Sequence, residues 1–167
     1  MNNTRKEKPM PGLFDDADVI STYTRTQALA DGALVTLPAQ LVGEAGFTCP
    51  IDMTAGAWAD TVRWTDVEES AKPFGTGQDE TGRAWDVLTM LRLSLASHTK
   101  RTGAHRYGDR IPVTLVRVPP SGTDTLPRPA TLHAVLGADE DHTPTITLMR
   151  PDEADQPTGD PAPRAAH

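Results

Sequence analysis

The chain contains very little cysteine: Cys49 is the single one among its 167 residues. One thiol forms no intramolecular disulfide and no cysteine-rich metal site. Cys49 stands between Thr48 and Pro50 beside apolar neighbours, and a free cysteine in such a run is usually a small buried residue. A nucleophilic cysteine needs a nearby histidine or a helix N-terminus. The sequence does not show one, so we interpret Cys49 as structural.

Long hydrophobic segments are also missing. No run reaches the roughly 18 apolar residues that a membrane span needs. The N-terminal residues lack the apolar core of a secretion signal. We therefore expect a cytoplasmic protein that does not insert into membranes. The formal net charge of −7 disfavours general nucleic-acid binding through bulk electrostatics.

Catalytic and cofactor-binding motifs are absent as well. The histidines show none of the HxH, HxxxH or HExxH spacings of metal sites. There is no glycine-rich phosphate-binding loop, no nucleophile elbow and no CxxC pair. The sequence therefore predicts no metal ion and no cofactor, and it favours a protein that is not an enzyme.

The composition indicates one domain between two polar tails. Hydrophobic residues make up 37% of the chain, and its 15 prolines and 13 glycines gather partly at the ends. Residues 1–12 and the proline-rich, acidic residues 151–167 have no apolar periodicity, so we predict that both are disordered. The segment 13–150 is then a single domain, long enough to bury a core.

Hydrophobic periodicity predicts the elements of this domain. The predicted helices cover 22–30, 38–44, 55–65 and 82–97. The predicted strands cover 34–37, 111–118, 130–136 and 143–149, with 47–51 extended and the acidic segment 66–77 a loop. The fold class is therefore predicted as α+β, with a helical N-terminal half packed on a small antiparallel β-meander from the C-terminal half.

The helix predicted at 82–97 is the most apolar one. Its main stripe consists of Ala84, Val87, Leu88, Leu91 and Leu95. Trp85, Met90 and Leu93 lie outside that stripe, so we expect a helix that is apolar over most of its circumference and central in the fold. Arg83 and Asp86 are left for its narrow solvent-facing side.

A polar cluster surrounds the start of this helix and is the first candidate site. Its members are Gln78, Asp79, Glu80, Arg83 and Asp86. One interpretation is helix capping, because acidic residues are favoured at a helix N-terminus and Arg83 can pair with Asp86 across one turn. The other is a ligand-binding or catalytic site in which the carboxylates converge with Arg83.

Two further candidate surfaces are less specific. Tyr23 and Arg25 are candidates for a partner-binding face, because both residue types are enriched at interaction hot spots. The segment 98–110 is basic despite the acidic chain. Its candidate contacts to nucleic-acid phosphates are Lys100, Arg101, Arg106 and Arg110. A solvated loop is the alternative there.

Several segments, taken in order, resemble a known family. They are Leu13-Phe14, Val19-Ile20-Ser21, Tyr23-Thr24-Arg25, Asp31-Gly32, Leu34-Val35, Trp58-Ala59-Asp60, Trp64, Gln78-Asp79-Glu80, Gly82-Arg83, Trp85-Asp86-Val87-Leu88 and Ile146-Thr147-Leu148-Met149. Over roughly 13–153 the chain is similar to the small bacterial proteins grouped as domain of unknown function 6573. Members of that family are encoded on plasmids, phages and integrated elements as well as chromosomes.

The resemblance assigns no catalytic residue. It implies an accessory protein of a mobile genetic element, and we expect this protein to act through a protein partner, for example in host defence or plasmid maintenance. Two alternatives remain open. One is a small enzyme or ligand-binding domain built on the polar cluster, and the other is a nucleic-acid binder that uses the basic segment.

Overall fold

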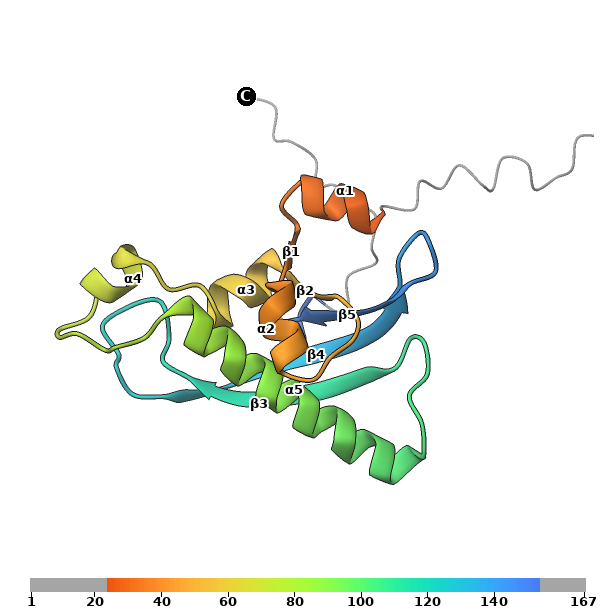
Figure 1. Cartoon of the computed structure of the whole chain (residues 1–167). Coiled ribbons are helices and arrows are strands. Elements are labelled where there is room, and N and C mark those ends of the chain that lie inside the picture. The colour runs from red at the N-terminus through yellow and green to blue at the C-terminus, as the bar shows by residue number, and fades with distance from the viewer. Residues whose placement is uncertain (1–23, 154–167) are drawn as a thin grey trace, which may run out of the picture.

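The structure is a computed structural model that describes residues 24–153, and Figure 1 shows its helices arranged around one sheet. The helices are α1 (Arg25–Ala30), α2 (Ala39–Glu44), α3 (Ala55–Thr61), α4 (Asp66–Ser70) and α5 (Glu80–Thr102). The strands are β1 (Leu34–Thr36), β2 (Ile51–Thr54), β3 (Arg110–Arg117), β4 (Arg128–Ala138) and β5 (Pro144–Met149). The fold is α+β, as predicted. No helix in this part of the chain is long and apolar enough to cross a membrane.

The sheet has five strands in the order β1-β2-β5-β4-β3. Strands β3, β4 and β5 form the antiparallel meander that the sequence predicts. Strand β2 then pairs parallel to β5, with Ile51 opposite Ile146, and β1 pairs antiparallel to β2. The prediction of a simple C-terminal meander is therefore wrong, because the sheet is mixed and two of its strands come from the N-terminal half.

Short strands explain this error. β1 and β2 contain only 3 and 4 residues, which is too few for alternation to reveal which neighbour they join. The prediction that the helices belong to the N-terminal half is also too narrow, since α5 continues to Thr102. Along the chain, α1, β1, α2, β2 and α3 alternate, α4 and α5 follow, and the three strands of the meander come last.

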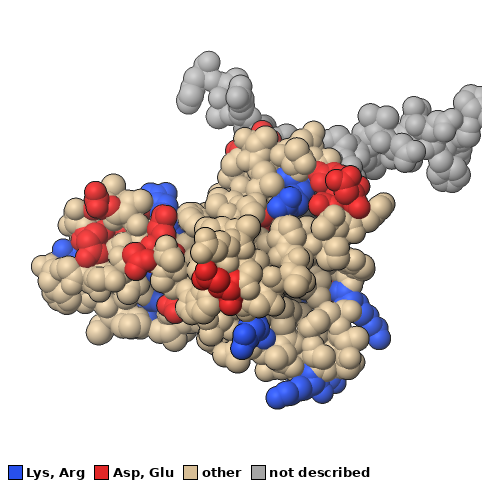
Figure 2. Space-filling model, in the orientation of Figure 1, with Lys and Arg blue, Asp and Glu red and all other residues tan. Residues whose placement is uncertain are grey.

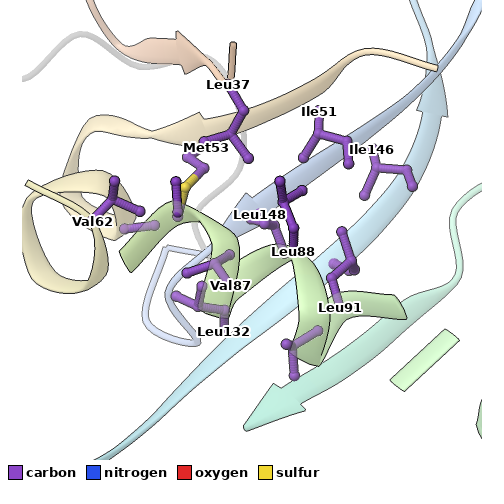
Figure 3. Packing of buried hydrophobic residues seen from close by; sticks show 14 of the residues in the cluster. Leu37, Ile51, Met53, Val62, Val87, Leu88, Leu91, Leu132, Ile146 and Leu148 are labelled. Carbon is purple, nitrogen blue, oxygen red and sulfur yellow. The ribbon is translucent and has the colours of Figure 1, made fainter. Parts of the chain in front are cut away.

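The hydrophobic core lies between α5 and one face of the sheet. Figure 3 shows Val87, Leu88 and Leu91 of α5 directed toward the strand residues Leu132 and Leu148. Each of these five side chains is fully buried. β3 alternates strictly, with every second residue buried against α5, as expected for a strand that has one face in the core.

Helix α5 covers the sheet on one side and is not the central helix that its composition predicts. Trp85 and Leu93 are 41% and 53% exposed, so two of the three apolar residues outside the main stripe face solvent, whereas Met90 is partly buried against the core. Arg83 is only 3% exposed, although the sequence pattern predicts a solvent-facing position. A helix on the surface of a single sheet buries one stripe, and Trp85 and Leu93 remain on the outer side of α5.

Helix α4 occupies part of the segment predicted as a loop. Thr65 caps it in a reciprocal capping box with Glu68: the Thr65 side chain accepts from a helix amide, and Glu68 Oε2 accepts from the Thr65 backbone N–H at 2.7 Å. With 5 residues, α4 is too short to show helical periodicity. Its Thr-x-x-Glu start is the signal that could have revealed it.

The predicted tails fall mainly outside the described residues. These predictions concern 1–12 and 151–167, whereas the structure describes 24–153. Glu153, within the second range, accepts hydrogen bonds from Thr54 Oγ1 at 2.6 Å and from the Arg150 backbone N–H at 2.8 Å. The chain therefore still contacts the domain beside the start of α3.

Candidate functional site

Asp79 and Glu80 bind backbone amides at the start of α5. Asp79 is the N-cap residue, and its Oδ1 accepts a hydrogen bond from the Gly82 N–H at 2.8 Å. Glu80 Oε1 accepts from the Trp64 N–H at 3.3 Å. Asp79 therefore has the geometry of a helix cap, whereas Glu80 binds an amide of the segment before α4 and caps no turn of α5.

Arg83 lies beneath the surface and ties three segments together. Its Nε donates to the Val62 carbonyl at 3.2 Å, and its Nη1 to the Val118 carbonyl at 3.1 Å. Nη2 donates to the Asp60 carbonyl at 3.3 Å, and Nη1 also donates to Gln78 Oε1 at 3.0 Å. The guanidinium therefore binds backbone oxygens and an amide, rather than Asp86, its predicted partner.

An indole and a second guanidinium complete this environment. The Arg83 guanidinium lies 4.7 Å from the centre of the Trp64 ring, a cation–π arrangement. Arg117 donates to Asp60 Oδ1 at 2.7 Å. Burial lowers the pKa of Arg83, and the positive charge of Arg117 lowers it further. Sequence patterns single out Arg83 but not Arg117, which stands in an ordinary strand alternation.

A cavity of about 270 Å³ adjoins this cluster. It is lined by Gln78, Arg83 and Asp86 from the predicted polar cluster, together with Arg117 and Thr61. Asp79 and Glu80 do not line it, so the structure divides the predicted cluster into the helix cap Asp79, Glu80 bound to the Trp64 amide, and a cavity-lining group. No group of three histidine, cysteine or acidic side chains suited to a metal ion occurs among residues 24–153.

A second feature, the α4 surface, lies at the same end of the molecule. We define it as α4, the loop that follows it and the β3–β4 loop, and Figure 1 shows these segments together. Lys72 Nζ joins them by donating to the carbonyls of Pro119, Gly122 and Asp124 at 2.7, 2.9 and 3.0 Å. Buried Lys72 also lies 5.5 Å from the Trp64 ring centre.

The predicted basic residues lie at the opposite end, around the C-terminus of α5. Lys100 and Arg101 occupy the last turn of α5, where positive charge is favoured by the helix dipole. Arg106 lies in the following loop and Arg110 begins β3, and all four side chains are exposed. Figure 2 shows Lys and Arg gathered over this end and acidic side chains over the end that carries α4.

Arg25 has a role within the fold. Its Nε and Nη2 bind the Asp52 carboxylate at 2.5 and 3.0 Å, and Asp52 is fully buried. The Thr36 hydroxyl donates to the same carboxylate at 2.7 Å. The hydrogen bond to Asp52 raises the pKa of Arg25. Tyr23, the other residue of the predicted partner face, lies outside the described residues.

These features define a small α+β protein with a polar cavity at one end of its long helix and a basic loop at the other. The chain belongs to DUF6573, a family of unknown function whose model matches residues 10–154. The resemblance inferred from the sequence is thereby confirmed over most of the chain. No curated protein and no solved structure matches it.

Proposed function

We propose that this chain is a cytoplasmic accessory protein of a mobile genetic element and that it acts by binding a protein partner through the α4 surface. The main observation that supports this proposal is the exposure of large apolar side chains on the α4 surface. Val67 is 72% exposed, Phe74 63% and Leu126 63%. Single exposed apolar residues are ordinary, but several at one end of a small domain are typical of an interaction surface.

Neighbouring elements extend this apolar character. Trp85, in the first turns of α5, is 41% exposed, and Val116, near the end of β3, is 58% exposed. Both residues belong to segments that border the cavity beside Arg83, since Val116 lines it and Trp85 lies between Arg83 and Asp86 in sequence. Aromatic residues are enriched at the centres of protein interfaces.

The α4 surface is held in a defined shape before any partner arrives. Glu69 accepts hydrogen bonds from Trp64 Nε1 at 2.7 Å and from the Thr76 N–H and hydroxyl, both at 2.6 Å. Lys72 fixes the β3–β4 loop against the same segment. A surface that is already ordered loses less conformational entropy on binding, which supports a recognition role for this region.

The charge of the α4 surface indicates the kind of partner. Across α4, the loop that follows it and the β3–β4 loop, the acidic side chains are Asp66, Glu68, Glu69, Asp79 and Asp124, and the one basic side chain is Lys72. Lys72 is buried, and Arg63 binds Glu68 at 3.2 Å. The remaining charge is negative, so a partner with a basic rim around an apolar centre is favoured.

The cellular setting of the proposal rests on the family. Members of DUF6573 are encoded on plasmids, phages and integrated elements, so a partner in host defence or plasmid maintenance fits best. Deleting the gene from the element that carries it, followed by measurement of retention and transfer, tests this part separately.

The binding proposal is tested by affinity capture of the tagged full-length protein from host lysate treated with nuclease. We expect one stoichiometric protein partner, and we expect Val67→Glu and Phe74→Glu to abolish its capture. Leu93→Glu is the matched control, because Leu93 is 53% exposed on the outer side of α5 and belongs to no part of the α4 surface. A partner captured equally by all three variants would refute the proposed surface.

The basic end supports nucleic-acid binding as a second candidate function. Lys100, Arg101, Arg106 and Arg110 are exposed at one end of the molecule, where phosphates could be contacted. Binding to single-stranded DNA measured by fluorescence anisotropy should then weaken steeply as salt increases, and Arg101→Gln should reduce the salt dependence. An affinity that does not change with salt would exclude this candidate.

A further inference from the structure

An apolar cavity of about 340 Å³ opens beside the C-terminal half of α5. Its apolar wall is formed by Leu95 of α5, Leu136 of β4, Ile146 of β5 and Cys49 from the segment before β2. Cavities of about 300 Å³ or more that are lined mainly by apolar groups are the usual form of small-molecule sites. This cavity is separate from the α4 surface and from the cavity beside Arg83.

The packing of α5 explains why this space exists. The buried residues of the helix end at Leu91, although the helix continues to Thr102. Leu95, one turn later, is only partly buried against the core. The small side chain of Cys49 lines the same cavity. Neither Leu95 nor Cys49 therefore fills the gap between α5 and the end of the sheet.

The loop after α5 supplies the polar side of the cavity. His105, Arg106 and Tyr107 line it, and Tyr107 is 69% exposed. The loop is fixed by Asp109, whose carboxylate accepts from the Arg106 backbone N–H at 2.9 Å and lies 3.3 Å from His98 Nε2. The Arg106 guanidinium forms neither of these contacts, although its charge contributes to the lowered pKa of Asp109.

The charge of the lining determines the ligand class. Within the described part of the chain no carboxylate lines the cavity, whereas His105 and Arg106 do. A negative group at the mouth is therefore favoured by Arg106, because a guanidinium forms strong charge-assisted hydrogen bonds with carboxylates and phosphates. The apolar wall favours an aliphatic or aromatic body.

We propose that this cavity binds a small molecule with an apolar body and one anionic head group, the body lying between Leu95 and Ile146 and the head on Arg106. The inference is independent of the proposed protein partner, because no residue of the α4 surface lines the cavity. A failure of one proposal therefore leaves the other intact.

Cys49 provides the readout, because it is the only cysteine in the chain and lines the cavity. Its rate of alkylation by N-ethylmaleimide is followed by mass spectrometry of the full-length protein. Burial raises the pKa of the Cys49 thiol, so the reaction is run at about pH 9 to provide enough thiolate. The probes are decanoate and 1-naphthoate below any micelle concentration, with 1-decanol and acetate as controls.

We expect decanoate or 1-naphthoate to slow alkylation in a saturable way, and acetate to have no effect. The more protective of the two acids distinguishes an aliphatic from an aromatic ligand. 1-Decanol, which lacks the charge, should protect with a midpoint about tenfold higher than decanoate, the loss expected for one charge-assisted contact. Equal alkylation rates with and without all probes would overturn the proposal.

Two variants test the role of the charge. Arg106→Gln should raise the decanoate midpoint about tenfold and leave the 1-decanol midpoint unchanged. Lys100→Gln is the matched control, because it removes another exposed positive charge, in the last turn of α5, without changing the lining. If both variants shift the decanoate midpoint equally, the ligand is attracted by general charge and the assigned head-group contact is wrong.

Discussion

Replacing Arg83 with methionine should destabilise the fold strongly, whatever the protein binds. Methionine retains most of the apolar stem and removes the guanidinium. The carbonyls of Val62, Val118 and Asp60 then lose a donor, as does Gln78 Oε1. Arg83 is 3% exposed, and its bonds to Val62 and Val118 are buried, so water cannot easily replace those two.

The magnitude follows mainly from the two buried acceptors, the carbonyls of Val62 and Val118. Leaving one buried acceptor unsatisfied costs about 1–3 kcal/mol, and loss of the contact with Trp64 costs about 1 kcal/mol more. Methionine offsets part of this, because the desolvation penalty of the buried charge disappears with the guanidinium. We therefore expect the free energy of unfolding to fall by about 3 kcal/mol, within the range for a broken buried network.

Urea denaturation followed by tryptophan fluorescence measures this change. Arg83→Lys separates charge from geometry, since an ammonium group cannot reach acceptors that the planar fork of arginine spans. It should recover less than half of the loss. Asp86→Ala is the control, because Asp86 is exposed and its removal should change the free energy of unfolding by less than about 0.5 kcal/mol.

The outcome separates the two interpretations of the polar cluster. If Arg83→Met unfolds at the same urea concentration as the parent protein, the guanidinium contributes nothing to the fold and our reading of its four hydrogen bonds is wrong. A residue maintained for ligand binding alone would show that result. If Asp86→Ala lowers the free energy of unfolding more than Arg83→Met does, Arg83 is not the residue that holds this polar cluster together.

Three further predictions use the same urea assay. Asp79→Ala should cost about 1 kcal/mol, the usual value of an N-cap, and a loss below the error of the assay would contradict its capping role. The pKa values of Glu68 and Glu140 are lowered from 4.5 to about 2 by hydrogen bonds, so their stabilising contribution is complete above about pH 4.5 and is lost as the pH falls toward 2. Glu68→Gln should weaken this pH dependence of the free energy of unfolding. An unchanged pH profile in that variant would argue against a contribution from Glu68. Finally, a Cβ on Gly56 would lie 2.3 Å from Glu153 Oε1, so that side chain must shift in Gly56→Ala. The gain from the helix propensity of alanine, about 1 kcal/mol, should therefore be smaller in the parent protein than in a Glu153→Ala background, and equal gains in both would contradict this clash.

The parts of the fold that depend on local chemistry could be predicted from the sequence. The start of α5 is specified by Asp79, a good N-cap, and its inner face by the apolar stripe from Ala84 to Leu91. The meander follows from three alternating segments separated by turns. In each case the residues that predict the element lie close together in the sequence.

The parts that depend on distant contacts could not be predicted. The parallel pairing of β2 with β5 joins residues about 95 positions apart, such as Ile51 and Ile146, and nothing in either segment specifies the other. The burial of Arg83 has the same origin, because its acceptors Val62 and Val118 come from segments on both sides of it in the chain. From the sequence alone, a charged residue at the start of a helix is expected to be exposed. Arg83 is buried because carbonyls from distant segments surround it.

The two ends of α5 carry different candidate sites. At its first turns the helix presents a buried guanidinium, and the α4 surface beside it is acidic and apolar. At its last turns it carries Lys100 and Arg101, and its side chains no longer fill the space above the sheet. A helix of 23 residues spans roughly 34 Å, several times the screening length of about 8 Å at physiological salt. Charges at the two ends therefore act independently, so the proposed partner surface at the acidic end and the proposed anion site at the basic end are electrostatically compatible on the same small domain.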